Sequence, residues 1–230
     1  MKTPPLVFSG MMSVLLLVPL AVSAQYLAFR PPATGPYVRF DLGPTFPDDG
    51  RLIAFGNVST GNTVRYDTGF ASTVAGGYAF NPWIAAELEL GWYWNEISQV
   101  QGFRLADTFF GQASFLANVV LQYPLPLTRL VPYIGGGLGG AATIFETDGF
   151  STRAATVVGS DSDLVFTYQI FAGLRFNLNP WMSVGVGYKY VASDDSSYHF
   201  ESLVCCRPDL HVQFEGMSIH MVTGNFTLKY

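Results

Sequence analysis

The sequence is short of charge, of cysteine and histidine, and of long apolar runs. Charged residues make up 13% of its 230 residues, well below the ~25% that is usual for soluble domains. Beyond the N-terminus, no apolar run approaches the ~20 residues that a membrane-spanning helix needs. The chain therefore fits neither an ordinary soluble domain nor a bundle of membrane helices.

The N-terminus has the features of an export signal. Lys2 supplies a positive charge, an apolar stretch covers 11–22, and small residues precede a cleavage point after Ala24. A membrane anchor is the alternative, but the apolar stretch is too short for one. No cysteine lies near the cleavage point, so a lipid-anchored N-terminus is not expected. We expect three parts: a signal peptide (1–24), a periplasmic lead-in (25–35) and a β-barrel (36–230).

The only two cysteines, Cys205 and Cys206, are adjacent. Adjacent cysteines lack the spacing of a zinc site and cannot join distant segments. In an exported protein they can form a vicinal disulfide or a bond to another chain. A plain surface pair of thiols is equally open.

Apolar residues are abundant but occur in short alternating segments. The chain is 49% hydrophobic and 15% aromatic. The stretch from Phe171 to Tyr190 shows the pattern best: two strands flank Asn179-Pro180, and Met182, Val184, Val186, Tyr188 and Tyr190 share one face. Alternate strand side chains point to opposite faces. The small or polar residues between them would face a narrow interior, and the apolar face would meet a membrane.

Eight such segments follow the lead-in, and no segment has a sustained helical period. They cover residues 37–43, 65–80, 83–94, 108–122, 131–144, 164–177, 181–192 and 217–230. The connections between them alternate between long and short. Membrane barrels have long extracellular loops and short periplasmic turns. The sequence thus predicts an all-β fold, an eight-stranded antiparallel up-and-down transmembrane β-barrel.

Charges on the predicted strands all fall at inward positions, so none need face lipid. Enclosed charges must pair, because an isolated buried charge is costly. We predict an ion-pair network around Glu87, Glu89, Arg39 and Arg175 that closes the lumen, which in an eight-stranded barrel is narrow enough for side chains to fill. The full set of predicted lumen residues is Arg39, Asp41, Arg65, Asp67, Glu87, Glu89, Arg175, Lys189 and Lys229.

An internal repeat places aromatic residues beside short turns. Phe80-Asn81-Pro82-Trp83 and Leu178-Asn179-Pro180-Trp181 each begin a strand with tryptophan. Trp and Tyr favour membrane–water interfaces, where an apolar ring can keep a polar group in water. We predict two aromatic girdles formed by Trp83, Trp92, Trp94, Tyr133, Trp181, Tyr190 and Tyr230.

The four long connections are strongly acidic. They hold Arg51, Arg104, Arg153 and Arg207, against Asp48, Asp49, Glu96, Asp107, Glu146, Asp148, Asp161, Asp163, Asp194, Asp195, Glu201, Asp209 and Glu215. Such a surface repels polyanions, so no nucleic acid partner is expected. It is suited to cations, or to lipid phosphates bridged by divalent ions; a solvated rim without a specific ligand is the simpler interpretation.

Several segments together resemble a known family. Tyr133–Gly139, with its run of glycines, the strand Tyr37–Gly43 and the hairpin of 171–190 resemble small outer-membrane barrels of the opacity-protein and outer-membrane-protein-A type. The resemblance implies a Gram-negative outer membrane, a structural, adhesive or surface-antigen role, and in some members a narrow pore. It also implies that the barrel-assembly machinery recognises the C-terminal strand ending at Tyr230, where the family commonly has Phe.

Motifs for chemistry are weak. Gly135–Gly140 formally matches a dinucleotide fingerprint, but a strand follows where a helix is required. An outward His220 beside Ser218 is the best case for a lipid-modifying enzyme, although a catalytic site needs further orienting groups. We therefore expect no enzyme activity, cofactor or metal. The expected function is a surface or envelope-integrity protein in contact with outer-membrane lipids; a narrow porin-like channel is the first alternative and a lipid-modifying enzyme the second.

Overall fold

The computed structural model describes residues 34–55, 58–101, 104–105, 108–151, 156–201 and 209–230, and its regular elements there are all strands. The strands that build the barrel are β1 (Gly35–Pro47), β4 (Gly69–Ala79), β5 (Ile84–Val100), β7 (Thr108–Gln122), β8 (Leu130–Ser151), β9 (Thr156–Asn177), β10 (Met182–Ser193) and β13 (Ser218–Lys229). Shorter strands are β2 (Gly50–Phe55), β3 (Val58–Tyr66), β6 (Arg104–Leu105), β11 (Ser196–Glu201) and β12 (Asp209–Phe214). No described helix is long and apolar enough to cross a membrane.

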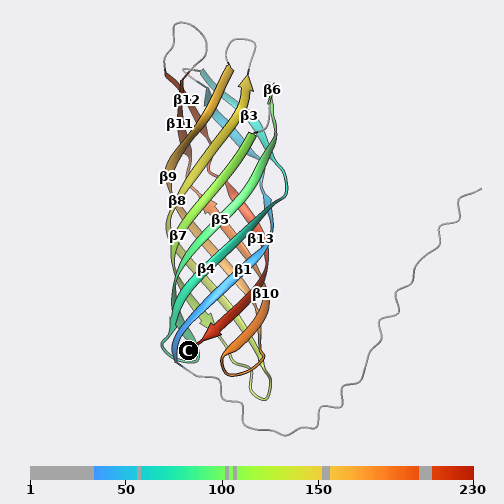
Figure 1. The fold of residues 1–230 in the computed structure, drawn as a ribbon, viewed down its shortest axis with the longest axis vertical. Helices are drawn as coiled ribbons and strands as arrows, with labels where there is room; N and C mark the ends of the chain where they lie inside the picture. The colour runs from blue at the N-terminus through green and yellow to red at the C-terminus, as the bar shows by residue number, and fades with distance from the viewer. Residues whose placement is uncertain (1–33, 56–57, 102–103, 106–107, 152–155, 202–208) are drawn as a thin grey trace, which may run out of the picture.

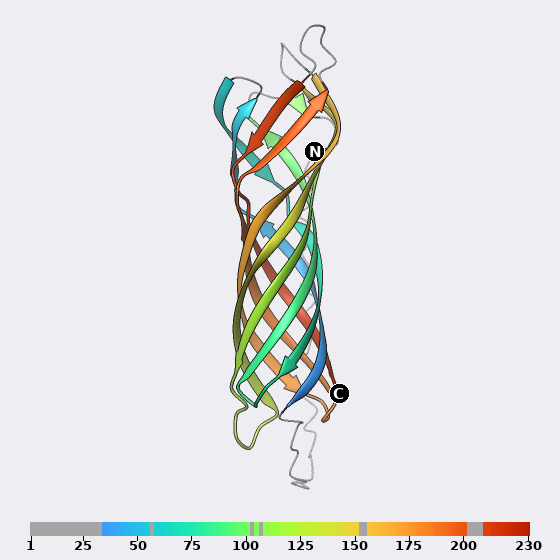
Figure 2. The same ribbon diagram turned by 90° about the vertical axis from the view of Figure 1, so that its left-hand side faces the viewer.

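The eight long strands close into a ring. Each pairs antiparallel with its neighbour along the chain, and β1 closes the ring by pairing with β13. Figures 1 and 2 show the resulting tall cylinder of tilted strands. Closure leaves no sheet edge within the wall, so every strand has hydrogen-bonding partners on both sides, as a lipid environment demands. The predicted eight-stranded antiparallel barrel is confirmed.

The wall continues well beyond the predicted strands at the end that carries the long connections. β2 pairs with β3 and β12, β3 pairs with β5, and β11 pairs with β12. The order around the barrel is the same as below. β2 takes the place of β1, β3 that of β4, β12 that of β13 and β11 that of β10. Much of 43–65 and 193–216 was predicted to be loop and is strand instead. We call this upper part the barrel extension; it occupies the upper end in Figures 1 and 2.

The two Asn-Pro turns at the opposite end have the same local structure. Asn81 Oδ1 accepts hydrogen bonds from the backbone N–H groups of Trp83 and Ile84, both at 2.8 Å. Asn179 Oδ1 does the same for the N–H groups of Trp181 and Met182, at 2.9 and 2.8 Å. An asparagine side chain of this kind replaces missing backbone partners in a tight turn. The sequence repeat therefore marks a structural repeat.

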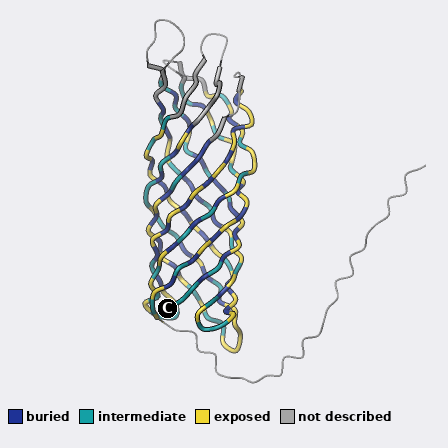
Figure 3. The backbone as a smooth tube through the Cα atoms, viewed as in Figure 1, coloured by how far each residue is buried: buried dark blue, intermediate teal, exposed yellow. Residues whose placement is uncertain are grey.

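Strand β5 shows where the surroundings of the barrel change. Between Ile84 and Trp94 the outward residues are exposed and apolar, while Glu87 and Glu89 are buried inside. Above Trp94 the polarity reverses, with Glu96 exposed and Ile97 buried. Ten tilted strand residues span about 25 Å, the height of a membrane barrel's apolar band. Figure 3 shows the alternation of buried and exposed positions along the wall.

Glycine provides the space for one large side chain in the lumen. A Cβ added to Gly135 of β8 would lie 2.4 Å from Phe171 Cζ of β9. No larger residue fits there unless Phe171 moves, and Phe171 is itself 2% exposed. The glycine run of β8 thus serves interior packing, which agrees with its rejection as a nucleotide-binding motif.

Candidate functional site: the barrel lumen

A compact network of ion pairs crosses the lumen. Arg39 Nη2 lies 2.7 Å from Glu87 Oε2 and 3.1 Å from Glu89 Oε2. Lys189 Nζ lies 2.6 Å from Glu89 Oε1 and 3.5 Å from Asp41 Oδ2. Asp41 also lies 3.5 Å from Arg39 Nη1. We call these five residues, all at most 3% exposed, the lumen network.

The local strand pattern explains why these residues meet. Arg39 and Asp41 alternate with outward Phe40 and Leu42 on β1, and Glu87 and Glu89 have the same arrangement on β5. Lys189 reaches in from β10. Because inward positions recur at every second residue, each of these three strands supplies one or two charges at the same height.

Neutral polar groups complete the network. Tyr37 Oη donates to Glu87 Oε1 at 2.7 Å, and Thr73 Oγ1 donates to Asp41 Oδ2 at 3.0 Å. Asn118 Nδ2 donates to Glu89 Oε2 at 3.3 Å. The ring centre of Phe171 lies 4.9 Å from Arg39 Cζ. All the oxygens of Glu87 and Glu89 are thus engaged by protein groups, whereas Asp41 Oδ1 has no hydrogen-bond partner. These neutral partners were not predicted from the sequence, although their inward strand positions were a usable signal.

Arg175 and Lys229 are not part of the lumen network. Arg175 is 2% exposed, but its Nη1 donates to the neutral Gln122 Oε1 at 3.2 Å, and its Cζ lies 4.9 Å from the Tyr133 ring centre. Lys229 Nζ donates to Asn177 Oδ1 at 2.9 Å. The prediction that Arg175 joins Glu87, Glu89 and Arg39 in one ion-pair network is therefore wrong, because Arg175 lies nearer the short-turn end of the lumen.

The placement of Arg65 and Asp67 in the lumen is also wrong. Both are exposed, and Arg65 Nε lies 3.8 Å from Asp49 Oδ2 on the outer surface. The predicted strand 65–80 is broken at residues 67–68, between β3 and β4. If the alternation of inward and outward positions is counted back from β4, it therefore assigns the residues of β3 to the wrong face.

Above the lumen network, the interior becomes apolar. Leu52, Phe145, Tyr198, Phe214 and Ile219 are among the fully buried residues of one cluster, which we call the upper apolar core. Phe145 packs against Phe214 with ring centres 5.3 Å apart. Burial raises the pKa of the Tyr198 phenol, so this group stays neutral. The extension thus resembles a soluble barrel, apolar inside and polar outside.

Most of the predicted girdle residues lie on the outer surface. Trp83, Trp181 and Tyr230 are exposed near the short-turn end, and Trp92 and Trp94 are exposed at the upper edge of the apolar band. Tyr190 is half-buried beside them. Tyr133 is an error: it is 5% exposed and points inward, where its Oη accepts from Asn225 Nδ2 at 2.9 Å.

His220 lies on the outer face at the upper edge of this band. Its Nδ1 contacts Tyr188 Oη, and its Nε2 lies 3.2 Å from Asp48 Oδ2. Ser218 Oγ instead lies 3.0 Å from Tyr190 Oη. The Ser218–His220 pair considered for a lipid-modifying enzyme is thus absent from the hydrogen bonds of the described residues.

In the part of the chain that the structure describes, no group of three or more His, Cys, Asp or Glu side chains is placed to hold a metal ion. Cys205 and Cys206 lie outside the described residues, as does the predicted signal peptide, so both remain predictions.

Comparison with known proteins agrees with the architecture. Residues 13–219 match the family model described as outer membrane protein beta-barrel domain. Neisserial surface protein A has a similar structure, with a TM-score of 0.56 and 12% identity over 86% of this chain and 99% of that one. The outer membrane protein OprG from Pseudomonas aeruginosa has a TM-score of 0.55 and 14% identity over 87% and 99%. No curated protein matches at the sequence level.

Proposed function

This chain belongs to the outer membrane protein β-barrel domain family, and we propose that it acts as a closed barrel that supports the envelope and displays its extension at the cell surface. The outer-membrane location itself follows from the family. The extension is then extracellular, and the short turns are periplasmic.

The single observation that carries this proposal is the buried ion-pair network in the lumen. Arg39, Lys189 and their three carboxylate partners cross the lumen with direct ion pairs. A buried pair with good geometry is expensive to break, because separation leaves uncompensated charge in a poorly solvated space. The upper apolar core adds a second obstruction above it. Both layers argue against a narrow porin-like channel.

A liposome-swelling assay tests the closed state. Proteoliposomes containing the refolded full chain should swell in small sugars or amino acids no faster than empty liposomes. An established porin reconstituted at the same protein-to-lipid ratio is the positive control. Swelling rates that increase with the amount of this protein would favour the channel alternative and defeat the proposal.

A deletion strain tests the role in the envelope. We expect loss of the protein to increase sensitivity to detergent and to large antibiotics, since these enter when the outer membrane is weakened. The wild-type chain and the surface variant Arg65→Gln, which lacks one positive charge, should both restore resistance. If the deletion strain were as resistant as the wild-type strain, the envelope-integrity role would be excluded and surface interaction would be the remaining function.

The proposed partners are the outer-membrane lipids and, during assembly, the barrel-assembly machinery. Exposed carboxylates at the upper edge of the apolar band, including Asp48, Asp67 and Asp194, disfavour nucleic acid as a partner. Strand β13 ends beside Tyr230, which is 67% exposed, and we propose that the assembly machinery reads this strand. Tyr230→Ala should slow insertion, whereas Tyr230→Phe should preserve it.

A further inference from the structure

We propose that the periplasmic mouth of the barrel contains a binding site for an oxyanion of the carboxylate or phosphate type, centred on Arg175 and Lys229. The site lies below the lumen network and goes beyond the envelope role proposed above. It occupies a small recess whose walls come from β1, β4, β7, β9 and the end of β13. Its lining includes Gly35, Tyr37, Gln122, Arg175, Lys229 and Tyr230.

The free edge of Arg175 is the first argument. Its Nη1 is used by Gln122, whereas its Nε and Nη2 are buried and have no hydrogen-bond partner. These two N–H groups lie on the same side of the guanidinium and point in parallel. They form the fork that binds two oxygens of one carboxylate or phosphate. Buried donors of a charged group are rarely left unmatched, because the loss of hydration is costly.

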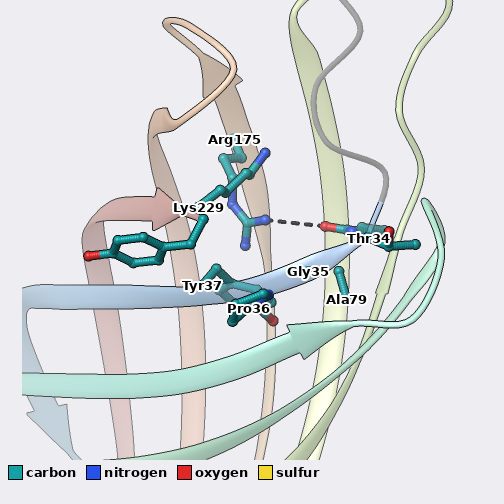
Figure 4. Close-up of a pocket in the computed structure, with 9 residues that line it drawn as sticks. Thr34, Gly35, Pro36, Tyr37, Ala79, Arg175 and Lys229 are labelled. Carbon is teal, nitrogen blue, oxygen red and sulfur yellow. Dashed lines mark hydrogen bonds between the residues drawn. The ribbon is translucent and has the colours of Figure 1, made fainter.

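The balance of charge is the second argument. Arg175 and Lys229 line the same recess and are close enough to repel each other. Among the described residues, neither has a carboxylate within ion-pair distance, in contrast to Arg39 and Lys189 deeper in the lumen. An anion between them would relieve the repulsion and supply the missing acceptors. Figure 4 shows both side chains extending into the recess above Tyr37 and Pro36.

The shape of the recess limits the ligand. Its volume of about 30 Å³ is room for roughly two water molecules, at ~10–15 Å³ each. Two oxygens of one carboxylate or phosphate group match this space, but a larger body does not enter it. The face of Arg175 is covered by Tyr133, so the ligand is expected to approach the edge of the guanidinium. The paired N–H groups of Arg175 favour an oxyanion with two available oxygens over a spherical anion such as chloride.

The test uses the full chain in nanodiscs of phosphatidylcholine, free of added phosphate. The Nε–H signal of Arg175 is followed by NMR during titration with inorganic phosphate, sodium acetate or sodium chloride. We expect a saturable shift with phosphate or acetate, at least tenfold tighter than any response to chloride. A second preparation with phosphatidylglycerol distinguishes the sources: a shift without added anion, reduced on adding phosphate, identifies a lipid headgroup as the occupant.

Variants separate the site from general charge effects. Lys229→Met should weaken phosphate binding at least threefold, as judged by the Arg175 signal. Arg175→Lys keeps the charge but loses the fork, and should bring binding by isothermal titration down to the chloride level. Arg65→Gln removes a positive charge at the other end of the barrel and should change nothing. The proposal is overturned if neither phosphate nor acetate gives a saturable shift, or if Lys229→Met and Arg65→Gln behave alike.

Discussion

Lys189 Nζ of β10 and Glu89 Oε1 of β5 lie 2.6 Å apart across the lumen, although 100 residues separate them in the chain. β5 and β10 occupy opposite positions in the ring of eight strands. The pair therefore spans the barrel from wall to wall. It ties together strands that share no backbone hydrogen bond, so its loss is felt by the whole barrel.

Replacing Lys189 with Met should strongly destabilise the barrel. Glu89 and Asp41 would keep only Arg39 as an ion-pair partner, and breaking such a buried pair costs about 3–5 kcal/mol. The free energy of unfolding by urea in lipid vesicles, followed by tryptophan fluorescence, measures the effect. The double variant Lys189→Met/Glu89→Gln should recover part of the loss, because the unpaired charge is gone. Arg65→Gln breaks only an exposed pair and should cost less than about 1 kcal/mol; equal losses in both variants would contradict this account.

Replacing Gly135 with Val should destabilise the barrel through overpacking. A Cβ at Gly135 already lies 2.4 Å from Phe171 Cζ, and such crowding typically costs about 1–3 kcal/mol. The measurement is the temperature at which the heat-modifiable band on a denaturing gel is lost. Gly76→Val is the matched control, since a Cβ at Gly76 meets nothing within 4 Å. We expect the added substitution Phe171→Ala to reduce the crowding in Gly135→Val. Similar melting temperatures for Gly135→Val and Gly76→Val would count against overpacking at Gly135.

Two arginine substitutions on β5 should locate the upper edge of the membrane. Leu88 is 57% exposed within the apolar band, and an arginine near the membrane centre costs about 2–4 kcal/mol. Leu88→Arg should therefore reduce the free energy of unfolding in vesicles by this amount. Ser98 is exposed above Trp94, so Ser98→Arg should have little effect. If Ser98→Arg proved as costly as Leu88→Arg, the membrane would extend over the barrel extension.

Truncating Phe214 should loosen the extension selectively. Phe214 is 1% exposed and packs with Phe145 and Tyr198, and Phe-to-Ala changes in a core cost about 3–5 kcal/mol. We expect Phe214→Ala to speed proteolytic cleavage of the extension in intact vesicles while the membrane-embedded strands stay protected. Leu164→Ala, at a site that is 78% exposed, is the control. Equal cleavage rates for wild type and Phe214→Ala would mean that the upper apolar core does not hold the extension together.

Period-two alternation was enough to predict the membrane-spanning strands and the inward charges on them. It worked for Arg39, Glu87, Glu89 and Lys189 because a membrane wall fixes which face is apolar. It failed at Arg65 and Asp67, where a break in the strand resets the alternation. No local feature of the sequence reveals such a break.

The extension and the inward position of Tyr133 were not predicted, for different reasons. Val212 and Phe214 alternate with Gln213, but above the membrane the apolar face turns inward, so the pattern of a membrane strand predicts a loop here. Tyr133 was placed in the girdle, yet Cβ atoms at Gly173 and Gly187 would lie 2.5 and 2.7 Å from its Oη. Those glycines mark the space that Tyr133 occupies inside the barrel. Their proximity depends on strand register, which the sequence alone does not specify.

Single-channel recording in planar bilayers tests the closed lumen most directly. The refolded full chain, inserted and verified by its heat-modifiable band, should give no unitary current steps under an applied voltage of either sign. The result follows from the Arg39–Glu87 and Lys189–Glu89 pairs, which place buried charged side chains across the lumen. Reproducible steps of fixed size that vanish when the protein is boiled before insertion would contradict the account.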